Sequence, residues 1–154
     1  MWLPSVGILN RSTLFLRPTP DITLTIPSTA SQVITVGAYD SRYQAYADFS
    51  GRGYTRVTNL VKPDLAAPGV NITAARAGGG YDTMTGTSFA APFVTGSAAL
   101  MMQWGIADGN DPFLYGEKVK AYLRRGARHL PGVDDWPNER LGWGALCLAD
   151  SFPG

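Results

Sequence analysis

The sequence predicts an α/β fold, because segments typical of strands alternate with segments typical of helices along its 154 residues. The stretch QVITVGAYD, residues 32–40, is apolar and β-branched, as buried strands of parallel sheets usually are. Residues 87–104 form an apolar run that has the length of a helix rather than a strand. Residues 111–130 alternate apolar and basic side chains at helical spacing, which predicts a second, amphipathic helix.

Shorter segments complete this pattern. The alternation of Ile22, Leu24 and Ile26 predicts a half-buried strand that Pro27 ends. Residues 61–75 contain two prolines and predict an extended segment that enters a strand at Val70–Ala75. RAGGGYD, residues 76–82, predicts a flexible loop. The final stretch RLGWGALCLADSF predicts a glycine-rich turn followed by a short apolar helix.

The run at 87–104 predicts a central helix that starts close to Ser88. Its apolar residues fall on nearly every face, so we expect the helix to be buried all round. Small residues such as Ala90 and Gly96 would allow neighbouring strands to approach closely. Pro92 fits the first turn, where its missing N–H has no helical partner to lose.

Composition bounds the possible functions. Hydrophobic residues make up 45% of the chain and charged residues 16%, as expected for one globular domain. The formal net charge of +1 predicts no nucleic-acid or anionic-membrane partner, and no run reaches the roughly 20 apolar residues of a membrane span. One cysteine, Cys147, and no zinc or calcium spacing predict neither a disulfide framework nor a metal or other cofactor. MWLPSVGILNR at the start lacks the features of a signal peptide.

Ser88 admits two interpretations. A serine at a helix start is favoured as an N-cap, because its hydroxyl accepts a hydrogen bond from an unpaired backbone N–H. The same unpaired N–H groups and the helix dipole stabilise a nearby anion, such as the oxyanion formed when a hydroxyl attacks a carbonyl. Gly86 would let the backbone turn sharply, and Ala90 and Ala91 would leave room for a peptide. Ser88 is therefore a candidate cap and a candidate nucleophile.

A longer string favours the nucleophile. GTSFAAP at 86–92, followed by VTG at 94–96, resembles the nucleophile motif of the subtilisin family of serine proteases. Other segments of the family's domain also have counterparts here, in the family's order: VITVGAYD at 33–40, FSGRG at 49–53, KPDLAAPG at 62–69 and LGWG at 141–144.

The resemblance implies the C-terminal portion of a subtilisin-like fold, with parallel strands around a central helix that starts at the nucleophile. It assigns Ser88 as the catalytic residue and Gly86 and Thr87 as support for the oxyanion site. It implies peptide or protein substrates and hydrolysis through an acyl-enzyme. Residues 26–154 would belong to the peptidase domain. Residues 1–25 would be an irregular lead-in, the tail of an inserted domain as in the clostridial spore-germination-type branch, whose members would be secreted or spore-associated.

The family's other catalytic residues are not found before Ser88. The family order is Asp, His, Ser, but neither D-[ST]-G nor H-G-T precedes Ser88, and no motif marks the oxyanion asparagine. We therefore expect the isolated chain to be inactive, to need the N-terminal part of the protease, and to self-associate through open edges.

Two other functions compete with this one. A pseudoprotease or peptide-binding module would need only the remaining groove. An α/β-hydrolase would pair Ser88 with His129, the single histidine, although a surface or capping role suits His129 at a basic helix end. Asp64, in KPDLAAPG, is interpreted as a structural residue that fixes a turn.

Overall fold

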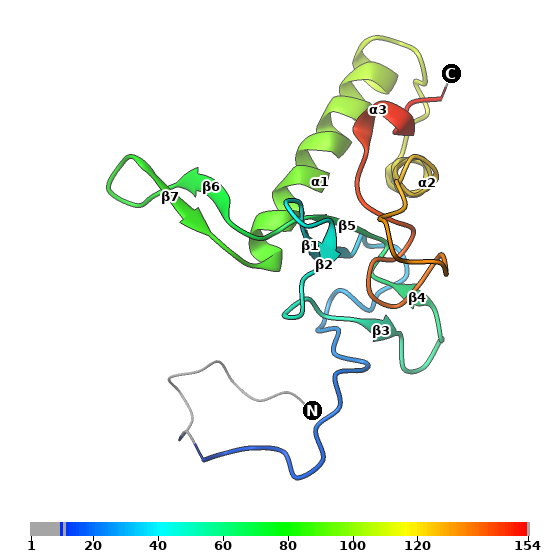
Figure 1. Ribbon diagram of the computed structural model, residues 1–154. Coiled ribbons are helices and arrows are strands. Elements are labelled where there is room, and N and C mark those ends of the chain that lie inside the picture. The colour runs from blue at the N-terminus through cyan, green and yellow to red at the C-terminus, as the bar shows by residue number, and fades with distance from the viewer. Residues whose placement is uncertain (1–9, 11, 154) are drawn as a thin grey trace.

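The computed structural model describes residues 10 and 12–153, which form a small sheet with helices packed beside it (Figure 1). Its main sheet has the strand order β2-β1-β5. β1 (Val36–Asp40) pairs in parallel with β5 (Leu65–Pro68), so that Val36 faces Leu65, and pairs antiparallel with β2 (Ala45–Tyr46). The buried parallel strand expected within residues 32–40 is confirmed, although it begins only at Val36.

The remaining strands form two antiparallel pairs. β3 (Gly53–Tyr54) pairs with β4 (Val61–Lys62), and β6 (Ile72–Ala75) pairs with β7 (Tyr81–Met84). β6 is the strand expected near residues 70–75, and it forms a hairpin with β7 that projects from the body of the molecule (Figure 1). The loop expected at 76–82 is therefore only the end of this hairpin.

Three α-helices follow the hairpin. α1 (Thr87–Met102) packs against β1 and β5 and continues as one π-helical turn, η1 (Gln103–Ala107). α2 (Gly116–Arg125) buries Val119 and Leu123, which confirms the predicted amphipathic helix, and packs against α3 (Leu148–Ser151). The fold is thus the α/β fold that the sequence predicts.

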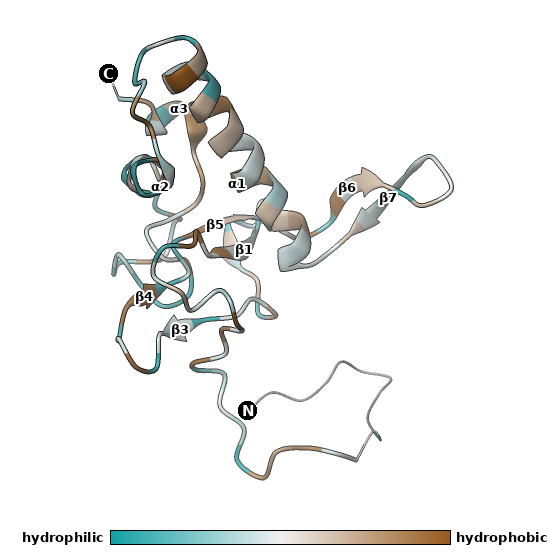
Figure 2. Ribbon diagram, turned by 180° about the vertical axis from the view of Figure 1, so that it is seen from behind, coloured by the Kyte–Doolittle hydropathy of each residue, from teal (hydrophilic) through white to brown (hydrophobic). Residues whose placement is uncertain are grey.

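α1 is not buried all round, which corrects the prediction from its apolar composition. Its buried residues form one stripe: Ala90, Val94, Ser97 and Met101. By contrast Leu100 is 53% exposed and Phe93 43%. In both views α2 and α3 lie on one side of α1, and the β6–β7 hairpin leaves on another (Figures 1 and 2). The described elements therefore cover one face of α1 and leave a second apolar face in contact with solvent.

The predicted strand at residues 22–26 is also wrong. Leu24 is buried, but Ile26 is 82% exposed and Ile22 has a positive φ of 54°. Thr23 N–H donates to the carbonyl of Arg52 at 2.9 Å, a contact that holds the segment without forming a ladder. Apolar residues do alternate in this segment, but of Ile22, Leu24 and Ile26 only Leu24 is buried in the core.

Gly142 provides a test of how tightly the C-terminal turn packs. Its φ is +62°, and an added Cβ would lie 2.2 Å from the carbonyl oxygen of Pro63. We expect Gly142→Ala to lower the free energy of unfolding by at least about 2 kcal/mol, from backbone overlap and left-handed strain. Denaturant unfolding measures this, with Gly132→Ala (φ +75°, open space around the Cβ) as the matched control. Equal losses in both variants would contradict the expected overlap.

Candidate active site

The first turn of α1 presents Ser88 to solvent. The helix begins at Thr87, its N-cap is Gly86, and no side chain caps it. Ser88 is therefore the second helical residue, and the interpretation of Ser88 as an N-cap is wrong. Its side chain is exposed and makes no hydrogen bond to any other described residue. The Ser88 hydroxyl therefore lies beside the first backbone N–H groups of α1, which have no partner within the helix.

Main-chain hydrogen bonds hold this turn on the sheet. Gly86 N–H donates to the carbonyl of Gly69 at 2.8 Å, and Gly69 N–H donates to the carbonyl of Tyr39 at 3.0 Å. Gly69 must be glycine for this approach, because an added Cβ would lie 2.7 Å from the Cβ of Ala38. Gly86 has φ 158° and ψ 160°, a backbone conformation that residues with side chains rarely adopt, so glycine suits this position.

A cavity of about 530 Å³ opens beside Ser88. Thr87, Ser88 and Ala91 line its helix side. The opposite side is formed by the segment that precedes and enters β1, which we call the wall segment, residues 27–36; its lining residues are Pro27, Ser28, Val33, Ile34, Thr35 and Val36. No periodic pattern could have predicted this wall, because residues 27–35 form no helix or strand.

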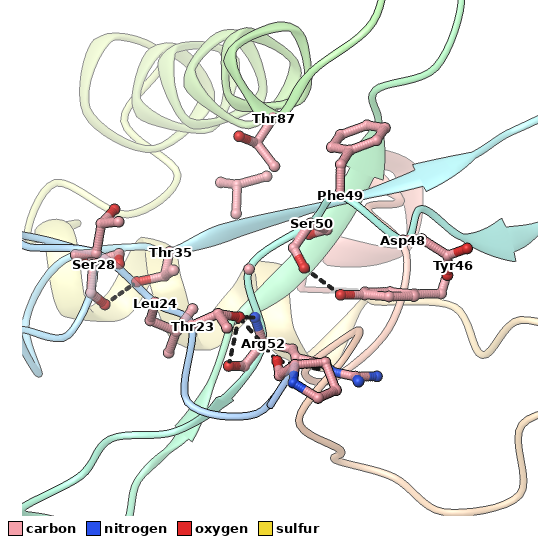
Figure 3. Close-up of a pocket in the computed structure, with 14 residues that line it drawn as sticks. Thr23, Leu24, Ser28, Thr35, Tyr46, Asp48, Phe49, Ser50, Arg52 and Thr87 are labelled. Carbon is pink, nitrogen blue, oxygen red and sulfur yellow. Dashed lines mark hydrogen bonds between the residues drawn. The ribbon is translucent and has the colours of Figure 1, made fainter. Parts of the chain in front are cut away.

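A second cavity, of about 430 Å³, adjoins the first and shares Thr25, Ser28, Thr35, Val36 and Thr87 with it. Figure 3 shows Thr87 directed toward this cavity from α1, with Ser28 and Thr35 to one side and Phe49 and Asp48 to the other. Most of the lining is polar, with hydroxyls from Thr23, Ser28, Thr35 and Ser50. Together the two cavities form a depression that runs away from Ser88, with an apolar lining beside Ser88 and a more polar lining farther away.

A buried ionic cluster lies behind the wall segment. Asp64 is fully buried, and its carboxylate contacts Lys62 Nζ at 2.7 Å, Lys120 Nζ at 3.2 Å and the Arg124 guanidinium. Thr35 N–H donates to the same carboxylate at 2.6 Å. Asp64 therefore does more than fix a turn, because it joins the start of β5 to α2 and to the wall segment.

Lys120 gives this cluster a pH dependence. Burial is the main cause that lowers the pKa of Lys120 below its ordinary 10.5, and Asp64 acts in the opposite direction while Lys62 and Arg124 add to the lowering. The unfolded chain binds more protons between the lowered value and 10.5, so this group adds stability as pH rises through that window. We expect the melting temperature of wild type relative to Lys120→Met to rise as the pH is raised from neutral toward 10.5. A constant difference would contradict the lowered pKa.

His129 is not brought to Ser88. Its exposed ring stacks on Trp136 with centroids 4.5 Å apart, and it shares no hydrogen bond with Ser88. The described residues thus offer no support for the α/β-hydrolase pairing. They also contain no group of three metal-ligating side chains that could hold an ion. No helix in the described part of the chain has the length and apolar character to cross a membrane.

An exposed serine in the first turn of a helix, held beside a partly parallel sheet and a cavity, is an arrangement that α/β serine hydrolases use for their nucleophile. Residues 13–144 match the model of the Subtilase family, and the chain belongs to that family. The resemblance seen in the sequence is therefore confirmed, together with the subtilisin-like fold.

Known relatives show the same likeness. The serine protease AprX of Bacillus subtilis is 36% identical over 155 residues, which is 86% of this chain and 32% of AprX. The structure of the Clostridium perfringens CspB protease matches 94% of this chain and 30% of that chain, with 47% identity and a TM-score of 0.88. The self-cleaved protease domain of PatA matches with 32% identity and a TM-score of 0.66, over 86% of this chain and 45% of that chain. The chain spans about a third of the length of AprX and CspB.

Proposed function

We propose that the chain is the C-terminal part of the catalytic domain of a subtilisin-like serine endopeptidase, and that Ser88 is its nucleophile. The observation that carries this proposal is the position of Ser88, exposed and free of hydrogen bonds to described residues, at the start of α1 beside a cavity of about 530 Å³. Membership of the subtilase family adds peptide bonds as the target of the reaction.

The chemistry follows from this placement. Ser88 Oγ attacks the carbonyl carbon of the scissile peptide while a base removes its proton. The carbonyl oxygen becomes an oxyanion, which the Ser88 N–H at the helix start stabilises, with Gly86 and Thr87 shaping that site. The amine leaves with a proton from the protonated base, and water then hydrolyses the acyl-enzyme.

The base must come from outside the described residues. His129 stacks on Trp136, so we assign the histidine, its aspartate and the oxyanion asparagine to the N-terminal part of the protease. The open face of α1, with Phe93 and Leu100, is the surface against which that part would pack. Residues 26–154 are then the C-terminal part of the peptidase domain and residues 1–25 the tail of an inserted domain, of which 12–25 form no helix or strand.

Labelling with a fluorophosphonate probe tests the proposal. We expect the chain alone to be labelled poorly, and the chain mixed with the N-terminal part of the protease to be labelled at Ser88. Ser88→Ala should abolish that labelling, and size-exclusion chromatography should show self-association of the chain alone but not of the mixture. Labelling of the isolated chain at Ser88 would contradict the need for an external base. Failure to label the mixture would favour a non-catalytic peptide-binding module, since the described residues give Ser88 no base.

A further inference from the structure

We propose that Lys62, Asp64 and Lys120 are positioning residues for substrate, because their buried cluster holds the wall segment of the cavity that faces Ser88. None of the three lines that cavity, so they act through the wall segment and are not catalytic residues. The proposal rests on the proposed function, in which this cavity receives part of the substrate.

The two lysines bind carbonyl groups in the middle of the wall segment. Lys120 Nζ donates to the carbonyl of Ser31 at 2.5 Å and to that of Val33 at 3.0 Å. Lys62 Nζ donates to the same Val33 carbonyl at 3.0 Å and to Thr35 Oγ1 at 3.2 Å. Each lysine thus joins the wall segment to another element, β4 for Lys62 and α2 for Lys120.

The wall segment has few other main-chain attachments. Residues 27–35 form no helix or strand, and the bonds of Ser28 to Thr25 and of Ala30 to Pro27 are local turns. Beyond the lysine contacts, Val36 joins the β1–β5 ladder, and Thr35 accepts from Asp64 N–H at 2.8 Å with its carbonyl and donates to the Asp64 carboxylate with its N–H. Ile34 packs against the hydrophobic core, and the cluster supplies most of the polar anchoring between Ser31 and Thr35.

Burial makes these contacts rigid. The side chains of Lys62 and Asp64 are 1% and 0% exposed, and that of Lys120 is 8% exposed. Hydrogen bonds to charged donors away from water are short and strong, and an orphaned buried carbonyl is costly. Val33, Ile34 and Thr35 reach the cavity directly from this anchored stretch. A displacement of the wall by about 1 Å would misplace a bound peptide and slow its reaction about 100-fold.

Lys120→Met in the full-length protease tests the proposal, because methionine keeps the apolar stem and removes the ammonium group. We expect kcat/KM for a peptide substrate to fall tenfold or more, while a small fluorophosphonate, which does not fill the cavity, reacts with Ser88 at an unchanged rate. Hydrogen exchange at the Thr35 amide should become at least tenfold faster. Lys120→Arg, which keeps the charge and donors, should recover part of the kcat/KM loss.

Lys118→Met is the matched control. Lys118 lies on the same helix and forms an ion pair with Asp111 at 2.6 Å, but it does not contact the wall segment. Equal kcat/KM and equal Thr35 exchange in the Lys118 and Lys120 methionine variants would overturn the proposal. If wild type itself fails to react with the fluorophosphonate, the proposed function fails. The exchange comparison then still decides whether the cluster anchors the wall. If Lys120→Met does not fold, Lys120→Gln, which removes the ammonium group but keeps a polar end at that position, is compared with Lys118→Gln in the same assays.

Discussion

Asp64→Ala is expected to lower the free energy of unfolding by about 3–5 kcal/mol, since it leaves buried cations without their shared anion. Lys62 is 1% exposed and Lys120 8% exposed, so solvent cannot replace the lost carboxylate. The Thr35 N–H would lose its acceptor as well. Denaturant unfolding of the chain, followed by circular dichroism, measures the loss.

Asp82→Ala is the control for this prediction. Asp82 is exposed in β7, and within the described part of the chain its carboxylate accepts a hydrogen bond only from the adjacent Thr83 N–H. Its removal should change the free energy of unfolding by no more than about 0.5 kcal/mol. A loss in Asp64→Ala no larger than that in Asp82→Ala would show that the cluster contributes nothing net to stability.

Ser88→Ala should reduce peptide hydrolysis by the full-length protease about a million-fold, the loss measured for subtilisin, a member of the same family. The alanine variant should still bind peptide, because Ser88 Oγ contributes nothing to holding the first turn of α1, which main-chain bonds attach to Gly69. A steady-state assay gives kcat, and a competition assay gives peptide affinity.

Thr95→Ala controls for changes in the helix itself. Thr95 is exposed on α1, about two turns beyond Ser88, and among the described residues its hydroxyl bonds only the carbonyl of Ala91. We expect its activity to stay within about twofold of wild type. Residual activity of Ser88→Ala above a hundredth of the wild-type rate would exclude Ser88 as the nucleophile.

Local patterns predicted the elements that depend on local residues. The start of α1, the amphipathic stripe of α2 and the strand within residues 32–40 all follow from periodicity, and the structure confirms them. The exposed face of α1 could not be predicted from periodicity. Hydrophobicity shows that a side chain favours burial, but it does not show which partner covers that side chain. The misassigned strand at residues 22–26 has the same cause, since Ile26 has the right period and no surface to meet.

The candidate site shows the same contrast between features set by neighbouring residues and features set by distant ones. GTSFAAP pointed to Ser88 because the motif is contiguous in the sequence. The wall segment and its ionic cluster were not predictable, because Thr35, Asp64 and Lys120 meet only through contacts between residues 29 to 89 positions apart. The N-cap interpretation of Ser88 was wrong by two residues, because Gly86 takes the N-cap position and leaves the Ser88 hydroxyl without a hydrogen bond to described residues.

The end of the β6–β7 hairpin is a suitable place to insert a short tag that carries a fluorophore. Its end carries Gly78, Gly79 and Gly80, around which an added Cβ would meet nothing within 4 Å. The two strands hydrogen-bond to each other, so a short tag inserted at Gly79 would be held by the hairpin itself, without disturbing the cavity beside Ser88. A fluorophore attached there would report when the chain binds the proposed N-terminal part of the protease, with Ser88 left unmodified.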